Sequence, residues 1–219
     1  MSRKRGETAS LSPSSLPSDR RAALVRRVRL LAWGGNAWHV IEFGVALSAG
    51  IAASSIALIG FGADSLIEAL AGLVIIWRFS GGRGSSEQAE RSAQRLIAAT
   101  YFVLAAYIGI ESIRDLIGGQ HPQTSWIGVG LAAFTAPTMP LLATAKRRLG
   151  RKLNSRATVH EAQQNQICAY LSVALLVGLL LNALAGWWWA DPAAALVIGA
   201  VALNEGIESC RSDADDNCC

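Results

Sequence analysis

Apolar residues gather in six long runs along this chain, separated by short polar or basic segments. The runs lie at about residues 30–51, 53–77, 96–117, 126–145, 162–185 and 189–207. A run of about 20 apolar residues, rising 1.5 Å per residue as an α-helix, crosses the roughly 30 Å hydrocarbon core of a bilayer. The pattern therefore predicts an all-α membrane protein with six transmembrane helices.

The segments outside these runs are polar and divide the chain into three parts. Residues 1–29 are rich in Ser, Pro and Arg and lack an apolar run, which predicts a disordered basic tail. Residues 30–207 form the transmembrane domain, and residues 208–219 form a short acidic tail. Three of the four cysteines lie in this last tail, where their role stays open.

The distribution of charge supports the same layout. The chain is 52% hydrophobic and only 16% charged, whereas soluble domains carry about 25% charged residues. Of its 20 Lys and Arg residues, all but Arg114 fall in the two tails and in the connections after the second and fourth runs. Because basic residues collect on the cytoplasmic side, both termini are predicted to be cytoplasmic, in a multi-pass protein of the cell membrane. The net charge of +4 is then a topology signal, and soluble enzymes and nucleic-acid-binding modules are poor candidates.

Two carboxylates stand out inside the second apolar run. Asp64 and Glu68 are four residues apart, so they project from one helix face. Counted from Arg78 by helix rise, they lie about 21 Å and about 15 Å deep. A carboxylate at such depth costs about 2.5–3.5 kcal/mol on insertion scales, and two together need a proton or a cation between them.

The fifth run opens with polar residues at matching depth. Counted from Arg156, Gln164 lies about 12 Å and Cys168 about 18 Å deep. If the second and fifth helices pack together, Asp64, Glu68, Gln164 and Cys168 surround one point. Zinc accepts four ligands of this kind, three with oxygen donors and one with sulfur, so the pattern predicts a metal site. The alternative is that Cys168 is buried only as a small apolar side chain.

The residues around these sites resemble the cation diffusion facilitator family of divalent-metal/proton antiporters. The resemblance is carried by ALIGFGADSLIEALAGLVIIW in the second run and by CAYLSVALLVGLLLNALAGWWWADPAAALVIGAVAL across the fifth and sixth. It implies a tetrahedral zinc site in which Asp64 and Glu68 match the family's acidic pair. Gln164 stands where the family has His, and Cys168 stands where it has Asp. The family also appends a ferredoxin-like cytoplasmic domain, which we do not expect here because only ESCRSDADDNCC follows the sixth run.

These features predict a carrier and not an enzyme. It would export a divalent transition metal, zinc first, from the cytoplasm in exchange for protons by alternating access, as a homodimer by resemblance. The expected partners are the metal ion, protons and the lipid bilayer, without nucleic acid and without a resident cofactor. The alternatives are a non-transporting membrane scaffold or regulatory protein with a degenerate metal site, and a carboxylate-lined path for protons or small cations.

Other polar residues allow two interpretations each. In the first run Asn36, His39 and Glu42 recur every three residues on one helix face, which fits either a proton relay or hydrogen bonds between helices. Asp191, followed by Pro192, is expected to cap the start of the sixth helix. Glu205 lies near the cytoplasmic end and is expected to be solvated.

Overall fold

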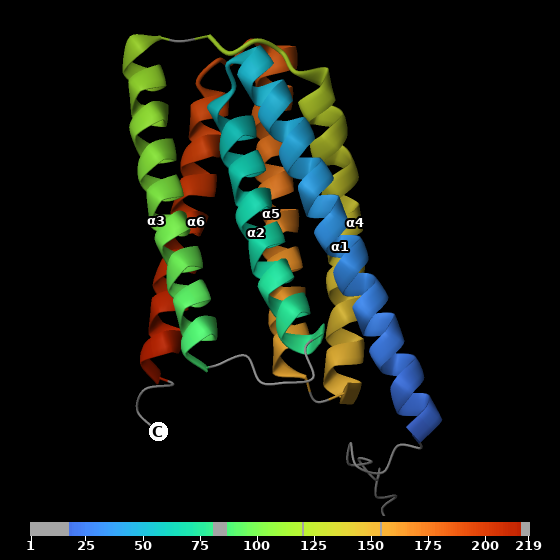
Figure 1. The fold of residues 1–219 in the computed structure, drawn as a ribbon. Helices are drawn as coiled ribbons and strands as arrows, with labels where there is room; N and C mark the ends of the chain where they lie inside the picture. Colours follow the sequence, from blue (N-terminus) through green and yellow to red (C-terminus); the bar gives the residue numbers. More distant parts are fainter. Residues whose placement is uncertain (1–17, 81–86, 120, 154, 216–219) are drawn as a thin grey trace, which may run out of the picture.

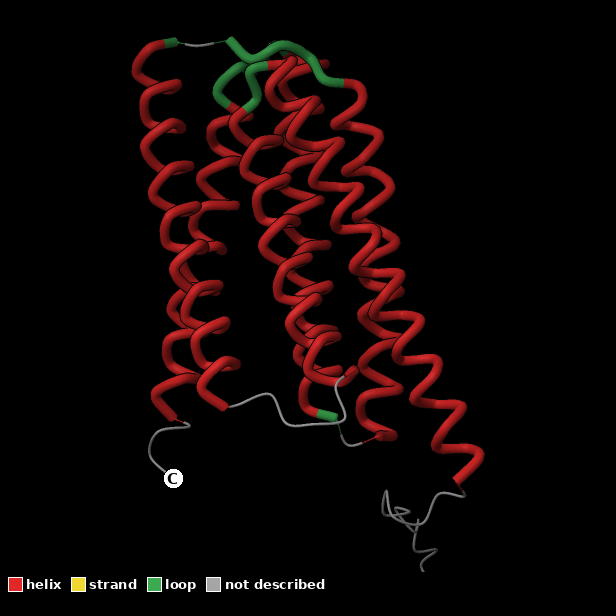
Figure 2. Tube along the Cα trace, in the orientation of Figure 1, coloured by secondary structure: helices red, strands yellow, loops and turns green. Residues whose placement is uncertain are grey.

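The computed structural model describes residues 18–80, 87–119, 121–153 and 155–215. These residues form six helices that run the length of one bundle (Figures 1 and 2). The helices are α1 (Ser18–Ala53), α2 (Ile56–Ser80), α3 (Glu87–Gly118), α4 (Trp126–Leu153), α5 (Arg156–Ala185) and α6 (Ala190–Asp215).

The helices pack mainly in three pairs. Helix α1 packs most extensively on α2, α3 on α6, and α4 on α5, while α2 also contacts α5 and α6 (Figure 1). The connections α1–α2, α3–α4 and α5–α6 lie at one end of the bundle, and the start of α1 and the end of α6 lie at the other. Both ends of the described chain are therefore on one side.

Five helices carry a stretch that is long and apolar enough to cross a membrane. The stretches are Ile56–Leu73, Arg95–Gly118, Trp126–Leu153, Thr158–Ala185 and Ala190–Arg211. The predicted first span, at 30–51, lies within α1, which does not meet the same criterion. The reason is its polar face, since Asn36, His39 and Glu42 point into the bundle and are at most 6% exposed.

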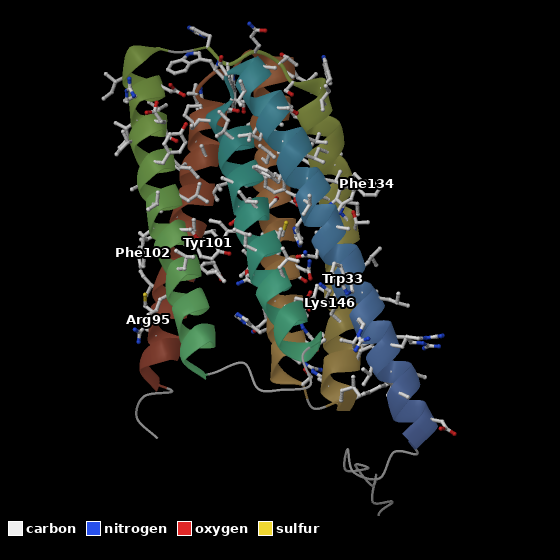
Figure 3. The ribbon with its side chains drawn as sticks, viewed as in Figure 1. Trp33, Arg95, Tyr101, Phe102, Phe134 and Lys146 are labelled. Carbon is white, nitrogen blue, oxygen red and sulfur yellow. The ribbon has the colours of Figure 1, made fainter. Side chains whose placement is uncertain are left out.

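The outer surface of the bundle is apolar, as a lipid-facing surface requires. Trp33, Phe102 and Phe134 are 50%, 37% and 53% exposed, and they lie on different helices around the bundle (Figure 3). Large aromatic and aliphatic side chains at such exposure are stable against hydrocarbon and not against water. The predicted all-α membrane fold is confirmed.

The helices extend beyond the predicted spans at both ends of the chain. Residues 18–29, which we expected to be disordered, form the first turns of α1, and residues 208–215 continue α6. The sequence RRAALVRRVR consists mainly of good helix formers, so the helix started in the apolar run propagates into the basic segment. The rest of the two predicted tails, residues 1–17 and 216–219, lies outside the described residues.

Asp191 caps a different helix from the one predicted. Its Oδ1 accepts a hydrogen bond of 2.5 Å from the Ser55 hydroxyl, and its Oδ2 accepts one of 3.3 Å from the backbone N–H of Ala57. The carboxylate of α6 therefore stabilises the N-terminus of α2, where unpaired N–H groups favour negative charge. Asp191 itself is 1% exposed, so this contact fixes α6 against α2 inside the bundle.

Two glycines allow helix backbones to approach closely. A Cβ on Gly62 of α2 would lie 3.0 Å from the backbone nitrogen of Leu47 in α1. A Cβ on Gly178 of α5 would lie 3.0 Å from the backbone oxygen of Ala190 in α6. Small residues at such crossings are a common basis of helix association in membranes. The two contacts hold α1 on α2 and α6 on α5, and so set the register of the polar residues between them.

Candidate metal centre

The polar face of α1 supplies a buried carboxylate that three helices hold in place. Glu42 is fully buried, and its Oε2 accepts a 2.9 Å hydrogen bond from the Ser65 hydroxyl of α2. Its Oε1 accepts a 2.6 Å bond from the Thr135 hydroxyl of α4, and the Cys168 thiol of α5 lies 3.8 Å from Oε2. These neutral donors orient Glu42 at the centre of the bundle.

Next to Glu42, three possible metal ligands come together from three helices. The ligand atoms of His39, Glu68 and Cys168 all lie within 4.8 Å of one another, and all three side chains are buried. The His39 Nδ1 is 3.1 Å from Glu68 Oε2 and 3.4 Å from Glu42 Oε2. An imidazole nitrogen, a carboxylate oxygen and a sulfur form a donor set that zinc and similar ions accept.

Two atoms of this cluster lack a hydrogen-bond partner. His39 Nδ1 and Glu68 Oε2 are buried and make no hydrogen bond among the residues that the structure describes, although they face each other at 3.1 Å. Their contact has the distance of an ion pair but not the direction of a hydrogen bond. Buried polar atoms in folded proteins are nearly always satisfied, so an unsatisfied pair marks a place for a proton or a cation.

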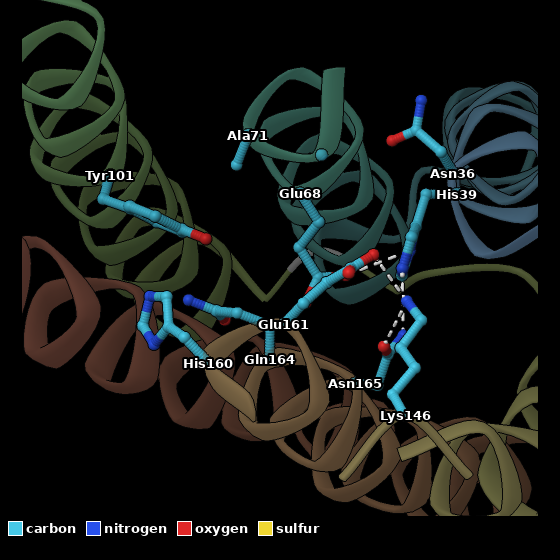
Figure 4. Close-up of a pocket in the computed structure, with 11 residues that line it drawn as sticks. Asn36, His39, Glu68, Ala71, Tyr101, Lys146, His160, Glu161, Gln164 and Asn165 are labelled. Carbon is cyan, nitrogen blue, oxygen red and sulfur yellow. Dashed lines mark hydrogen bonds and ion pairs between the residues drawn. The ribbon is translucent and has the colours of Figure 1, made fainter. Parts of the chain in front are cut away.

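A chain of hydrogen bonds links His39 to a buried lysine (Figure 4). Asn165 Nδ2 lies 3.3 Å from His39 Nε2, and Asn165 Oδ1 accepts a 2.9 Å bond from Lys146 Nζ. Lys146 also pairs with Glu161 at 2.6 Å. Lys146 is only 2% exposed and lies in the half of the bundle nearer the two chain ends (Figure 3). A buried ammonium needs such partners, because removing an ion from water costs several kcal/mol.

A cavity of about 60 Å³ lies beside this chain of hydrogen bonds. It has room for about four water molecules. Glu68 and His39 line one part of it, and the exposed His160 lines another (Figure 4). Lys146 and Tyr101 line it as well. The cavity therefore joins the metal-ligand cluster to the end of α5 at which the chain termini lie.

The four predicted metal ligands do not all meet at one point. Of the four, Cys168 and Glu68 lie together in the three-ligand cluster. Gln164 lines the cavity with Glu68, but its amide donates a 2.8 Å hydrogen bond to Glu205 Oε2. Asp64 is 4% exposed and lies one turn from Glu68 on α2, outside both the cavity lining and the three-ligand cluster. Their joint role in binding metal stays a prediction.

Sequence reasoning misplaced or missed several residues of this region. Glu205, expected to be solvated, is 5% exposed because it packs against Gln164. No sequence pattern singled out Asn165. Lys146 had been counted with the surface charges, although it is the basic residue nearest to the fourth apolar run. That position was the available sign that it lies inside the bundle.

Comparison with known proteins assigns this bundle to a family. The sequence pattern that defines the cation efflux transmembrane domain matches residues 37–216. The chain belongs to the cation efflux family. This confirms the family expected from the motifs of the second, fifth and sixth apolar runs, and it is a family of transporters and not of enzymes.

Several individual proteins are also similar to this chain. An uncharacterized transporter of Synechocystis sp. is 26% identical over 186 residues, which cover 81% of this chain and 59% of that protein. An uncharacterized transporter of Methanocaldococcus jannaschii is 27% identical over 119 residues, covering 54% and 42%. The magnetosome protein MamB of Magnetospira sp. is 31% identical over 116 residues, covering 53% and 39%. The chain spans about half the length of these relatives.

Proposed function

We propose that this chain carries a divalent transition-metal cation, zinc first, out of the cytoplasm in exchange for protons. Membership of the cation efflux family supports the transport of a cation. The observation that carries the proposal is the position of Glu68, which lines the cavity and also lies beside the ligand atoms of His39 and Cys168. Its Oε2 is buried and makes no hydrogen bond among the described residues. A cation that enters the cavity finds its first unsatisfied anionic ligand there.

The mechanism we propose is alternating access with competition for the same oxygens. The cavity at the His160 end of α5 admits the ion, and Glu68 exchanges its proton for it. Asp64, one turn further along α2, is the second carboxylate of the path. After the bundle opens to the other side, protons bind the carboxylates and release the ion. Metal and protons are coupled because a ligand must be deprotonated to bind metal.

The proposed direction depends on the orientation of the bundle. Both termini are cytoplasmic in this proposal, since the basic residues collect at the end of the bundle where the described chain begins and ends. A homodimer in the cell membrane is part of the same proposal, from the family resemblance. The cavity then faces the cytoplasm, from which the ion is loaded.

Proton movement driven by a metal tests this function. The full chain is reconstituted into vesicles that contain a pH indicator, and zinc, cadmium, cobalt, iron, manganese and nickel are added in turn. We expect a metal-dependent pH change, largest for zinc, that Asp64→Ala reduces strongly. If Asp64→Ala leaves zinc flux unchanged, Asp64 is not part of the path. If protons move without any divalent metal, a proton path replaces the metal carrier.

A non-transporting scaffold is the second candidate, and one contact favours it. The Lys146 ammonium lines the cavity and already supplies a positive charge among its carboxylates. A chain that used Lys146 as its permanent counter-ion would need no metal. Titration of the purified protein with zinc separates the two functions, because the scaffold shows no saturable binding that depends on Asp64 and Glu68.

A further inference from the structure

The ligand atoms of His39, Glu68 and Cys168 are spaced for one small ion. A tetrahedral zinc ion holds its ligand atoms about 3.4–3.6 Å apart, given distances of about 2.1 Å to nitrogen or oxygen and about 2.3 Å to sulfur. The His39 nitrogen and Glu68 oxygen are 3.1 Å apart, and all three ligand atoms lie within 4.8 Å. Side-chain shifts of a few tenths of an ångström up to about 1 Å bring the three atoms around one ion.

Two of these atoms are among the five buried side-chain atoms that make no hydrogen bond within the described part of the chain. His39 is 6% exposed and Glu68 is 7% exposed, and the unpartnered His39 Nδ1 and Glu68 Oε2 face each other. The neighbouring Glu42 differs, since hydroxyl groups of α2 and α4 already bond to both of its oxygens. We therefore treat Glu42 as a residue that positions the site and not as a ligand.

We propose that His39 of α1, Glu68 of α2 and Cys168 of α5 form the ion-binding site of the carrier, for ions that accept imidazole and thiolate ligands. The inference rests on the proposed function and names its substrate class, which includes zinc, cobalt and cadmium. Magnesium, calcium and manganese prefer oxygen ligands and are poor substrates for such a site. The fourth ligand position is left for water, which lets the ion enter and leave.

The site takes its nitrogen ligand from α1, which the sequence pattern did not predict. Gln164, the residue expected at the nitrogen position on α5, is turned toward Glu205 instead. The imidazole of His39 reaches Glu68 from α1 instead (Figure 4). Binding the ion therefore ties α1 to α2 and α5, so these three helices have to move together while the ion is bound.

Cobalt(II) absorption tests the ligand set directly. For this test the three other cysteines of the chain are changed to Ser, so that Cys168 is the only thiol. This variant is titrated with cobalt in detergent. We expect a thiolate-to-cobalt charge-transfer band that the further change Cys168→Ser abolishes. His39→Gln should weaken cobalt binding at least 10-fold. The matched control His121→Gln, an exposed histidine at the other end of the bundle, should change it less than 2-fold.

X-ray absorption at the zinc edge gives a second readout that needs no variant at the site. In the same single-thiol protein we expect one sulfur at about 2.3 Å and nitrogen or oxygen ligands at about 2.0–2.1 Å, with the multiple scattering of an imidazole. A first shell without sulfur or without imidazole overturns the proposed site. Binding with this ligand set but without zinc flux in vesicles overturns the proposed function and leaves the site standing. Zinc flux and affinity unchanged by His39→Gln overturn the site and leave the function standing.

Discussion

Asn165 decides which nitrogen of His39 carries the proton. Its Oδ1 accepts from Lys146 Nζ at 2.9 Å, and an ammonium can only donate, so the orientation of the amide is fixed. Asn165 Nδ2 therefore donates to His39 Nε2 at 3.3 Å, which makes Nε2 an acceptor. A neutral imidazole then has its hydrogen on Nδ1, the atom that faces Glu68. In this tautomer Nδ1 has no lone pair, so this hydrogen has to leave Nδ1 before His39 can bind the ion, and that step weakens binding in the unmodified protein.

The substitution Asn165→Asp should reverse this arrangement at nearly constant side-chain volume. One carboxylate oxygen still accepts from Lys146, while the other accepts a hydrogen from His39 Nε2 and leaves Nδ1 free to bind the ion. Partners of this kind change metal affinity by about 10–100-fold. We therefore expect zinc to bind about 10–100-fold more tightly, a gain of about 1.4–2.8 kcal/mol. Competition with a chromophoric zinc chelator at fixed pH measures the affinity of both proteins.

The control separates this tautomer effect from simple charge attraction. Gln164→Glu adds the same negative charge one residue away, in the lining of the same cavity, without a contact to His39. We expect it to increase zinc affinity less than Asn165→Asp does. Equal increases would mean that added charge alone explains both results. A larger increase for Gln164→Glu would restore the side chain at position 164 as a metal ligand.

Three further predictions concern stability and orientation. Asp191→Asn replaces one of the two carboxylate oxygens that accept hydrogen bonds at the α2 N-terminus by an amide NH2 group, which can only donate. Thermal unfolding in detergent should therefore show a loss of about 1–3 kcal/mol in the free energy of unfolding. Lys146→Met leaves Glu161 without its partner and should destabilise the bundle by up to about 3–5 kcal/mol, of which the added change Glu161→Gln restores a part; equal stability of the two variants would contradict the ion pair. When Cys218 and Cys219 are changed to Ser, a membrane-impermeant maleimide should label the exposed Cys210 only from the cytoplasmic side, and it should not label the buried Cys168. Labelling of Cys210 from outside would contradict the proposed topology.

The fold could be predicted from the sequence because each transmembrane helix is encoded locally. About 20 apolar residues suffice to specify a span, whatever the helix packs against. The α1 helix shows the limit of this rule. Asn36, His39 and Glu42 lower the mean hydropathy of its span. The helix lies in the bundle because neighbouring helices bury these three side chains.

The site could be predicted only along the two helices whose depths could be compared. Counting residues from the basic ends placed Glu68 and Cys168 at similar depth, and they lie together in the structure. Depth alone does not give the rotation of a helix about its axis. Gln164 therefore turned out to face Glu205, and Asn165, the next residue, faces His39.

Counting charges misplaced Lys146 for a different physical reason. The positive-inside rule treats a basic residue near the end of a span as solvated, and this holds only while nothing in the bundle can pair with it. Lys146 has Glu161 and Asn165 within hydrogen-bonding distance, so its ammonium lies in the bundle at 2% exposure. Such pairing depends on contacts between helices that no single run of sequence contains.

The most direct test of the central claim is the rate of zinc transport by the Glu68→Gln variant in reconstituted vesicles. The amide keeps the size of the side chain but removes the anionic ligand that lies between the cavity and the His39 and Cys168 atoms. Glu208→Gln, an exposed change on α6, serves as the control. We predict that Glu68→Gln abolishes zinc flux driven by a proton gradient while the control retains it. Zinc flux through Glu68→Gln at the rate of the unmodified protein would contradict the account.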